Sequence, residues 1–197
     1  MISFLYSIFA VTCLPQDSGL SGSYSPKIDE IIKSVIKLKK DEPKVKILIF
    51  SHWDTILNAI KPGLSANDIK LIHSINSTKF PQEIKAFKLE DFTCLLINLK
   101  FAGKGLNLIE ATHVFLVEPI LNPDDEMQAV GRIHRIGQER FTFVHRFITK
   151  KTIEENIYDK IIKAKDKWLS KDFTLRDIQE LLDIKWSRDD EDKDLPF

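Results

Sequence analysis

The sequence predicts an α/β protein, a parallel sheet with helices on both faces, and three observations lead to this fold class. Short apolar runs alternate with segments of helical periodicity along most of the 197 residues. The apolar runs are nearly continuous, as in strands that are covered on both faces. The composition, 43% hydrophobic and 29% charged, supplies a sizeable core and excludes a wholly disordered or fibrous chain. One main domain with appended ends fits this length.

The regular pattern begins with a helix at Ser25-Pro26, where a serine cap precedes a proline whose backbone suits the first helical turn. Pro43 ends this helix, and the first buried strand follows at residues 46–50. The same alternation predicts the remaining elements: helices at 54–60, 81–87, 124–135, 152–168 and 174–182, and strands at 69–73, 93–97, 114–117 and 142–147. Strands and helices that alternate in this way imply parallel strands joined by crossover helices.

We expect three parts in the chain: an N-terminal segment at 1–24, the α/β domain at 25–184, and an acidic, solvated tail at 185–197. The uncharged run Met1–Leu14 lacks a basic start and is shorter than the ~20 residues that cross a bilayer. It is read as a core segment, as the product of a misplaced translation start, or as a secretory signal. The glycines and serines of Asp17–Ser25 indicate a linker, and we expect no membrane partner.

The charge balance and the cysteine count exclude several classes of site. Lys+Arg and Asp+Glu both number 29, so any contact with nucleic acid must come from local patches. The two cysteines, Cys13 and Cys94, with five histidines, cannot build a RING or a zinc-finger array. We therefore expect ordinary reduced thiols and no metal site in this chain.

Three segments that follow predicted strands are the candidate sites, because ligands of such sheets lie beyond the carboxyl ends of the strands. The first is Phe50-Ser51-His52-Trp53, in which Ser51 could equally cap the next helix. The second, residues 98–108, contains Gly103-Lys104-Gly105, which suits a close approach to phosphate or a plain turn. The third is residues 128–138, which carry two arginines.

The third segment has a spacing with chemical meaning. Gln128, Arg132 and Arg135 are four and three residues apart, so a helix would project all three from one face. Two neighbouring guanidinium groups repel each other, and a fold tolerates them most readily when an anion lies between them. The alternative is an exposed basic helix end that interacts with the helix dipole.

The order of these segments resembles the second RecA-like lobe of Swi/Snf-type ATPases in the helicase superfamily. The resemblance rests on four strings in sequence: Ile49-Phe50-Ser51, Gly103-Lys104-Gly105-Leu106-Asn107-Leu108, Glu118-Pro119-Ile120-Leu121-Asn122-Pro123 and Gln128-Ala129-Val130-Gly131-Arg132-Ile133-His134-Arg135-Ile136-Gly137-Gln138. Residues 109–114, which lead into residues 117–123, and residues 173–177 are more narrowly similar to ubiquitin ligases that join linker-histone, PHD, RING and helicase modules.

The resemblance implies roles for particular residues. Arg132 and Arg135 would be arginine fingers that reach the γ-phosphate of ATP. Four residues would line the nucleotide side of the cleft or shape the start of the arginine helix: Gly105, Asn107, Gln128 and Gly131. Three would face the DNA backbone: Ser51, Lys100 and Lys104. The chain has Leu99-Lys100-Phe101-Ala102-Gly103 where most relatives have T-x-A-G-G, so a hydroxyl that touches phosphate is missing.

By the same resemblance, ATP with Mg would be bound mainly by a first RecA-like lobe. No G-x-x-x-x-G-K-[ST] loop occurs here, because the Gly103-Lys104 pair is preceded by Asn98 at the required spacing. The chain would hold half of an active site, with the first lobe and double-stranded DNA or a nucleosome as partners in the nucleus. The alternatives are a non-catalytic binding module derived from such a lobe and an unrelated Rossmann-like domain for a small molecule.

Overall fold

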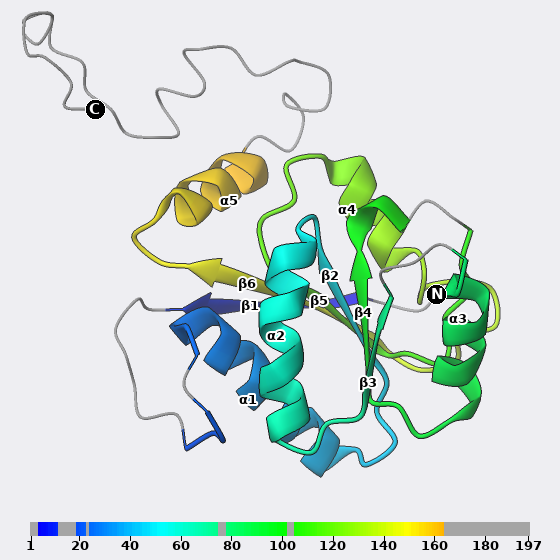
Figure 1. Ribbon diagram of the computed structural model, residues 1–197. Coiled ribbons are helices and arrows are strands. Elements are labelled where there is room, and N and C mark those ends of the chain that lie inside the picture. Colours follow the sequence, from blue (N-terminus) through cyan, green and yellow to red (C-terminus); the bar gives the residue numbers. More distant parts are fainter. Residues whose placement is uncertain (1–3, 12–18, 23, 75–77, 102–104, 164–197) are drawn as a thin grey trace, which may run out of the picture.

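The computed structural model describes residues 4–11, 19–22, 24–74, 78–101 and 105–163. Its centre is a six-stranded sheet in the order β1-β6-β5-β2-β4-β3, with every strand parallel to its neighbours (Figure 1). The strands are β1 (Phe4–Val11), β2 (Ile47–Ser51), β3 (Leu71–Ser74), β4 (Cys94–Asn98), β5 (His113–Leu116) and β6 (Thr142–Thr149). The helices are α1 (Pro26–Asp41), α2 (Asp54–Ala66), α3 (Phe80–Leu89), α4 (Pro123–Val130) and α5 (Ile153–Lys163). The predicted fold class is confirmed.

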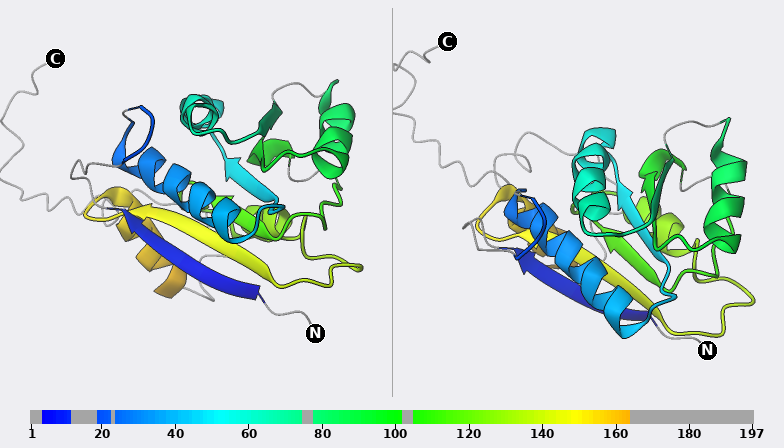
Figure 2. Two further views of the ribbon diagram at one scale, coloured as in Figure 1. Left: turned by 90° about the horizontal axis from the view of Figure 1, so that it is seen from below. Right: turned by 60° about the horizontal axis from the view of Figure 1, so that its bottom comes forward.

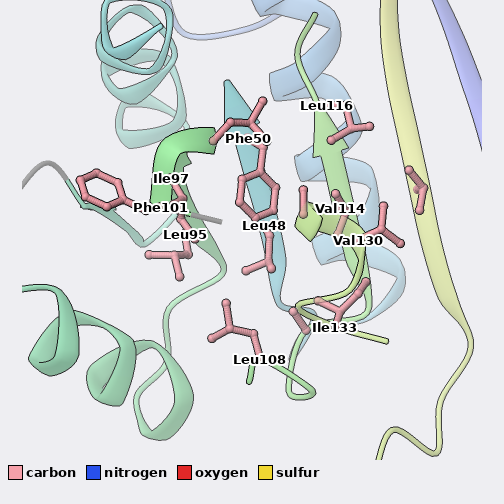
Figure 3. Close-up of a cluster of buried hydrophobic side chains, with 14 of the residues drawn as sticks. Leu48, Phe50, Leu95, Ile97, Phe101, Leu108, Val114, Leu116, Val130 and Ile133 are labelled. Carbon is pink, nitrogen blue, oxygen red and sulfur yellow. The ribbon is translucent and has the colours of Figure 1, made fainter. Parts of the chain in front are cut away.

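Helices cover both faces of the sheet, as the continuous apolar strands predicted (Figure 2). On one face α1 and α2 pack on alternate strand residues, and Ile32, Leu57 and Ile49 are fully buried there. On the other face α3 and α4 pack on the intervening residues, including Phe50 and Leu95 (Figure 3). Strands β2 and β4 therefore supply side chains to two cores, which is why their apolar runs have no polar alternation.

Strand β1 was not predicted as a strand of this sheet. It pairs in parallel with β6 along its whole length, from Phe4 opposite Thr142 to Val11 opposite Thr149, and forms an edge of the sheet (Figure 1). The uncharged N-terminal run therefore has a place in the α/β fold through residues 4–11. Its pairing partner lies far along the chain, and local sequence patterns do not contain that information.

Helix α2 is longer than predicted, because it continues past Pro62 to Ala66. A proline costs a helix one backbone hydrogen bond, yet Leu64 is fully buried and holds the last turn in the core. Gly63 allows α1 to approach closely, since a Cβ atom there would lie 2.4 Å from Cδ1 of Ile32. Tertiary burial thus outweighs the local helix-ending signal.

Helix α4 is shorter than predicted, and the expected helix over 124–135 is wrong at its C-terminal end. The helix ends at Val130 with Gly131 as its C-cap, and turns follow. Gln128 and Gly131 therefore lie at the end of this helix, and the expectation that they shape its start is wrong. The start of the helix is shaped instead by its N-cap, Asn122, whose side chain accepts a hydrogen bond from the backbone N–H of Asp124 at 3.0 Å.

Candidate functional site

The two arginines lie against the glycine loop, although the two segments are far apart in sequence. Nη1 of Arg135 donates to the carbonyl of Gly105 at 3.2 Å, and Nη1 of Arg132 lies 3.5 Å from the carbonyl of Leu106. The backbone N–H of Leu108 donates to the carbonyl of Arg132 at 2.9 Å. These contacts join residues 105–108 and 131–135 into one surface, which we call the arginine site.

Apolar anchors explain why the two segments meet. Leu108 and Ile133 are both fully buried in the cluster that lies beneath α3 and α4 (Figure 3). Ile133 stands between the arginines in sequence, so its burial fixes the positions of the polar residues on either side. The 105–108 loop is fixed in the same way through Leu108.

Each arginine is also tied to the backbone one turn before it. Nε of Arg132 donates to the carbonyl of Gln128 at 2.9 Å, and Nε of Arg135 donates to the carbonyl of Gly131 at 3.1 Å. These bonds keep both guanidinium groups on one side of the chain although α4 has ended. Arg132 is only 7% exposed, whereas Arg135 is exposed. Arg132 is therefore the anchored member of the pair, and Arg135 the accessible one.

The electrostatics of the pair favour an anion. Burial lowers the pKa of Arg132, and the neighbouring charge of Arg135 lowers it further. A guanidinium nevertheless keeps its proton at neutral pH. Within the described residues, no carboxylate forms an ion pair with either arginine. Among the described residues, the partners of these two positive charges are therefore backbone carbonyl dipoles.

Three glycines in or next to the arginine site, Gly105, Gly131 and Gly137, are required by the local backbone or by close contacts. Gly105 has a φ of 67° and Gly137 a φ of 101°, conformations that L side chains rarely adopt. A Cβ atom at Gly131 would lie 2.9 Å from the carbonyl oxygen of Met127, so only glycine fits this turn without a shift. Asn107 and Gln128 are exposed beside these turns, where their amides are accessible to a ligand.

Gln138 connects the two segments of the arginine site on their buried side, a role that its sequence context does not predict. It is 3% exposed, and its amide nitrogen lies 2.9 Å from the carbonyl of Ile109, 3.1 Å from that of Ala111 and 3.2 Å from that of Ile133. Its Oε1 accepts the backbone N–H of Arg140 at 3.1 Å. One buried side chain therefore joins the end of the glycine loop to the arginine segment. A glutamine among glycines and arginines gives no local sign of this.

The second candidate region is the carboxyl edge of β2 and β4. Ser51 is fully buried, and its hydroxyl accepts the backbone N–H of Trp53 at 3.0 Å. Ser51 therefore stabilises a turn inside the protein, and the side chains exposed at this edge of the sheet belong to other residues. Trp53 is 62% exposed.

Asn98, which sequence analysis did not single out, fixes this edge. Its amide donates to the carbonyl of His52 at 2.9 Å and to Oδ1 of Asp54 at 3.0 Å, and it accepts the N–H of Lys100 at 3.0 Å. Nζ of Lys100 pairs with Oδ2 of Asp54 at 3.2 Å. Partial burial acts to raise the pKa of Asp54, but the hydrogen bonds from Asn98 and Lys100 outweigh it and hold that pKa below its usual value.

A hollow of about 500 Å³ opens between these residues and α4. The charged side chains that line it are Lys100, Asp54 and Asp125, so acids outnumber bases around it. A DNA phosphate at Lys100 would therefore compete with Asp54 for the ammonium group. Lys104, the other predicted DNA contact, lies outside the described residues.

In the described part of the chain, no cluster of three or more His, Cys, Asp or Glu residues could hold a metal ion. None of the helices described there is long and apolar enough to cross a membrane.

The sheet order, the helices on both faces and the arginine site define a RecA-like α/β lobe. The model of the helicase conserved C-terminal domain matches residues 26–137, more than half of the chain. The chain belongs to this family, and it is a helicase C-terminal domain of the Swi/Snf type. The predicted family is therefore confirmed.

Individual relatives agree with this assignment. The chain is 41% identical over 143 residues to human "E3 ubiquitin-protein ligase SHPRH", covering 72% of this chain and 8% of that protein. It is 40% identical over 142 residues to "Uncharacterized ATP-dependent helicase IRC20" of Saccharomyces cerevisiae, covering 68% and 9%. The chain thus spans less than a tenth of the length of either relative. The crystal structure of the C-terminal part of the Fun30 ATPase domain is 28% identical with a TM-score of 0.66, covering 78% of this chain and 48% of that one.

Proposed function

We propose that this chain is the second motor lobe of a DNA-dependent ATPase and translocase, and that Arg132 and Arg135 act on ATP bound by a first lobe. The observation that carries the proposal is the arginine site itself. Two guanidinium groups are held on one surface by bonds to the carbonyls of Gln128 and Gly131, with no carboxylate paired to them in the described residues. A surface of this kind suits the terminal phosphate of a nucleotide held opposite it.

The two arginines differ in burial, and this difference suits phosphoryl transfer. The transition state spreads negative charge over the oxygens of the transferred group, and fixed positive charge lowers its energy. Arg132 is largely buried and rigidly held, so it supplies a preorganised charge. Arg135 is exposed and can contact an oxygen when the two lobes close. Gly105 and Asn107, on the neighbouring loop, would lie on the nucleotide side of the same cleft.

The wider setting is also a proposal. A relative named as an E3 ubiquitin-protein ligase and another named "DNA repair protein RAD5B" of Arabidopsis thaliana support a parent protein that works on chromatin or in DNA repair. The partners would be the first lobe of that protein and double-stranded DNA or a nucleosome, in the nucleus. ATP with its Mg would be held mainly by the first lobe, and ubiquitin transfer would belong to another module.

The proposal is tested by comparing this chain with a protein that contains both lobes. The chain alone should not hydrolyse ATP, because arginine fingers act only on a nucleotide held opposite them. In the two-lobe protein, Arg132→Lys or Arg135→Lys should lower kcat by a factor of ~10² or more, with DNA affinity within twofold, because lysine lacks the planar fork.

Arg140→Lys is the matched control. Arg140 follows the same segment, and its guanidinium donates to the carbonyls of Ile109 and Glu110 and pairs with Glu42. We expect its kcat to stay within twofold of the parent. If lysine at both Arg132 and Arg135 preserved turnover, the arginines would be surface charge and the chain a binding module derived from a motor lobe. DNA-stimulated hydrolysis by the chain alone would also contradict the proposal.

A further inference from the structure

A second hollow, of about 760 Å³, lies between the C-terminal half of α1, the end of α2 and residues 19–21. It shares no residue with the arginine site or with the hollow at the strand ends. The ends of α1 and α2 that border it are drawn at the bottom of Figure 1. We call it the lysine groove, after four residues of α1 that line it: Lys33, Lys37, Lys39 and Lys40.

The groove has a strong local charge on a chain that is neutral as a whole. Its charged lining residues are the four lysines and Asp68, a balance of 4 − 1 = +3. Within the described residues, no carboxylate forms an ion pair with any of these lysines. Lys39 donates to the backbone carbonyl of Asp68 at 3.0 Å, so it closes one end of the groove. Lysines in the last turn of α1 also interact well with the helix dipole, but Lys33 and Lys37 lie before that turn.

Asn67 holds the walls of the groove together. Its amide donates to the carbonyl of Gly63 at 2.9 Å and to the carbonyl of Ser21 at 3.4 Å. Its Oδ1 accepts the backbone N–H of Ser21 at 3.2 Å. One side chain therefore fastens residues 19–21 to the end of α2.

The lining also contains apolar side chains: Leu20, Ile36, Ala66 and Ile69. A bare phosphate backbone offers nothing to these residues, whereas a peptide with both acidic and apolar side chains matches the whole groove. The chain contains such a peptide. Five acids, Asp189, Asp190, Glu191, Asp192 and Asp194, precede Leu195-Pro196-Phe197. With Lys193 included, residues 189–197 carry five negative side chains and one positive, a balance of −4.

We propose that the lysine groove is the docking site of the chain's own acidic tail, residues 189–197. The acids would face the α1 lysines, and Leu195 and Phe197 would cover the apolar lining. The length of the connecting chain permits the tail to reach the groove, because 25 residues can reach at most roughly 80 Å, about twice the diameter of a domain of this size. Covalent attachment gives an effective concentration on the order of mM, which suffices for a weak site. The proposal does not depend on the function of the arginine site.

Zero-length carbodiimide coupling in the full chain tests the contact, because it joins a carboxyl to an amine only where the two touch. We expect residues 189–194 to couple to Lys33, Lys37 or Lys40 within the monomer, at least tenfold more than to Lys85, an exposed lysine of α3 that serves as the control. Coupling should fall in 0.5 M NaCl, where the Debye length is only about 4 Å. Equal coupling to Lys85, or coupling found only in covalent dimers, would overturn the proposal.

Variants separate docking from chance contact. K33E/K37E/K40E should abolish the selective coupling, and replacing the tail acids by lysine in that background should restore it with the charges reversed. Neutralising the tail acids to Asn and Gln leaves the groove intact and should speed amide hydrogen exchange at residues 19–22 and 66–69 at least threefold. Unchanged exchange would refute docking. Protection of the groove by a DNA duplex that does not require the tail would assign it to nucleic acid and equally refute the proposal.

Discussion

Gln138→Met should destabilise the protein by about 3 kcal/mol. The glutamine amide has two N–H groups shared among the carbonyls of Ile109, Ala111 and Ile133, and its oxygen accepts one backbone N–H. Methionine therefore removes about three hydrogen bonds, two that the glutamine donates and one that it accepts, at about 1 kcal/mol each. Methionine keeps nearly the same volume, so a cavity adds little to the loss. The change in stability thus measures the hydrogen bonds rather than packing.

The assay is urea denaturation, with the free energy of unfolding extrapolated to water. Gln82→Met is the control, since Gln82 is exposed on α3, and it should change stability by less than about 0.5 kcal/mol. Gln138→Glu adds a check on sign, because burial among three carbonyl oxygens raises the pKa of the new carboxyl. This variant should gain stability as the pH falls through that pKa, where the acid becomes a donor. A loss below 1 kcal/mol for Gln138→Met would refute the view that Gln138 holds the site together.

Two further predictions concern charge. His113 and His145 are buried, with Nδ1 of His113 3.0 Å from Nε2 of His145, and burial lowers the pKa of each to about 4. The unfolded chain therefore binds protons at a higher pH than the folded protein does. The free energy of unfolding should be at its full value above pH 6.5 and should fall by on the order of 2 kcal/mol per histidine toward pH 4.5. The double variant His113→Phe/His145→Leu should flatten this part of the stability curve, and an unchanged curve would contradict the argument. Lys100→Ala should weaken DNA binding equally for all sequences and reduce the slope of log affinity against log salt concentration by about one unit. Asp54→Asn removes the ion pair of Lys100 and should strengthen DNA binding. Anisotropy titrations from 50 to 200 mM NaCl measure both effects, and a slope unchanged in both variants would place the DNA surface elsewhere.

The amino-acid sequence by itself determined the fold class, the order of most elements and the presence of the arginine pair. These are local properties. Continuous apolar strands such as Ile47–Ser51 indicate burial on both faces, and helical periodicity marks the segments between them. The arrangement of Arg132 and Arg135 can also be predicted from the sequence, because each arginine bonds to a carbonyl only four residues before it, that of Gln128 or Gly131.

Only the tertiary structure decided how distant segments are joined. It placed β1 beside β6, carried α2 past Pro62, and ended α4 at Val130. It also assigned Ser51 to a buried turn, and Asn98 and Gln138 to the polar joints between loops. The physical reason is that a buried polar side chain must find partners wherever the fold brings them, and those partners are often tens of residues away. A residue's type reveals its capacity to donate or accept, and the packing of the sheet and helices selects what it meets.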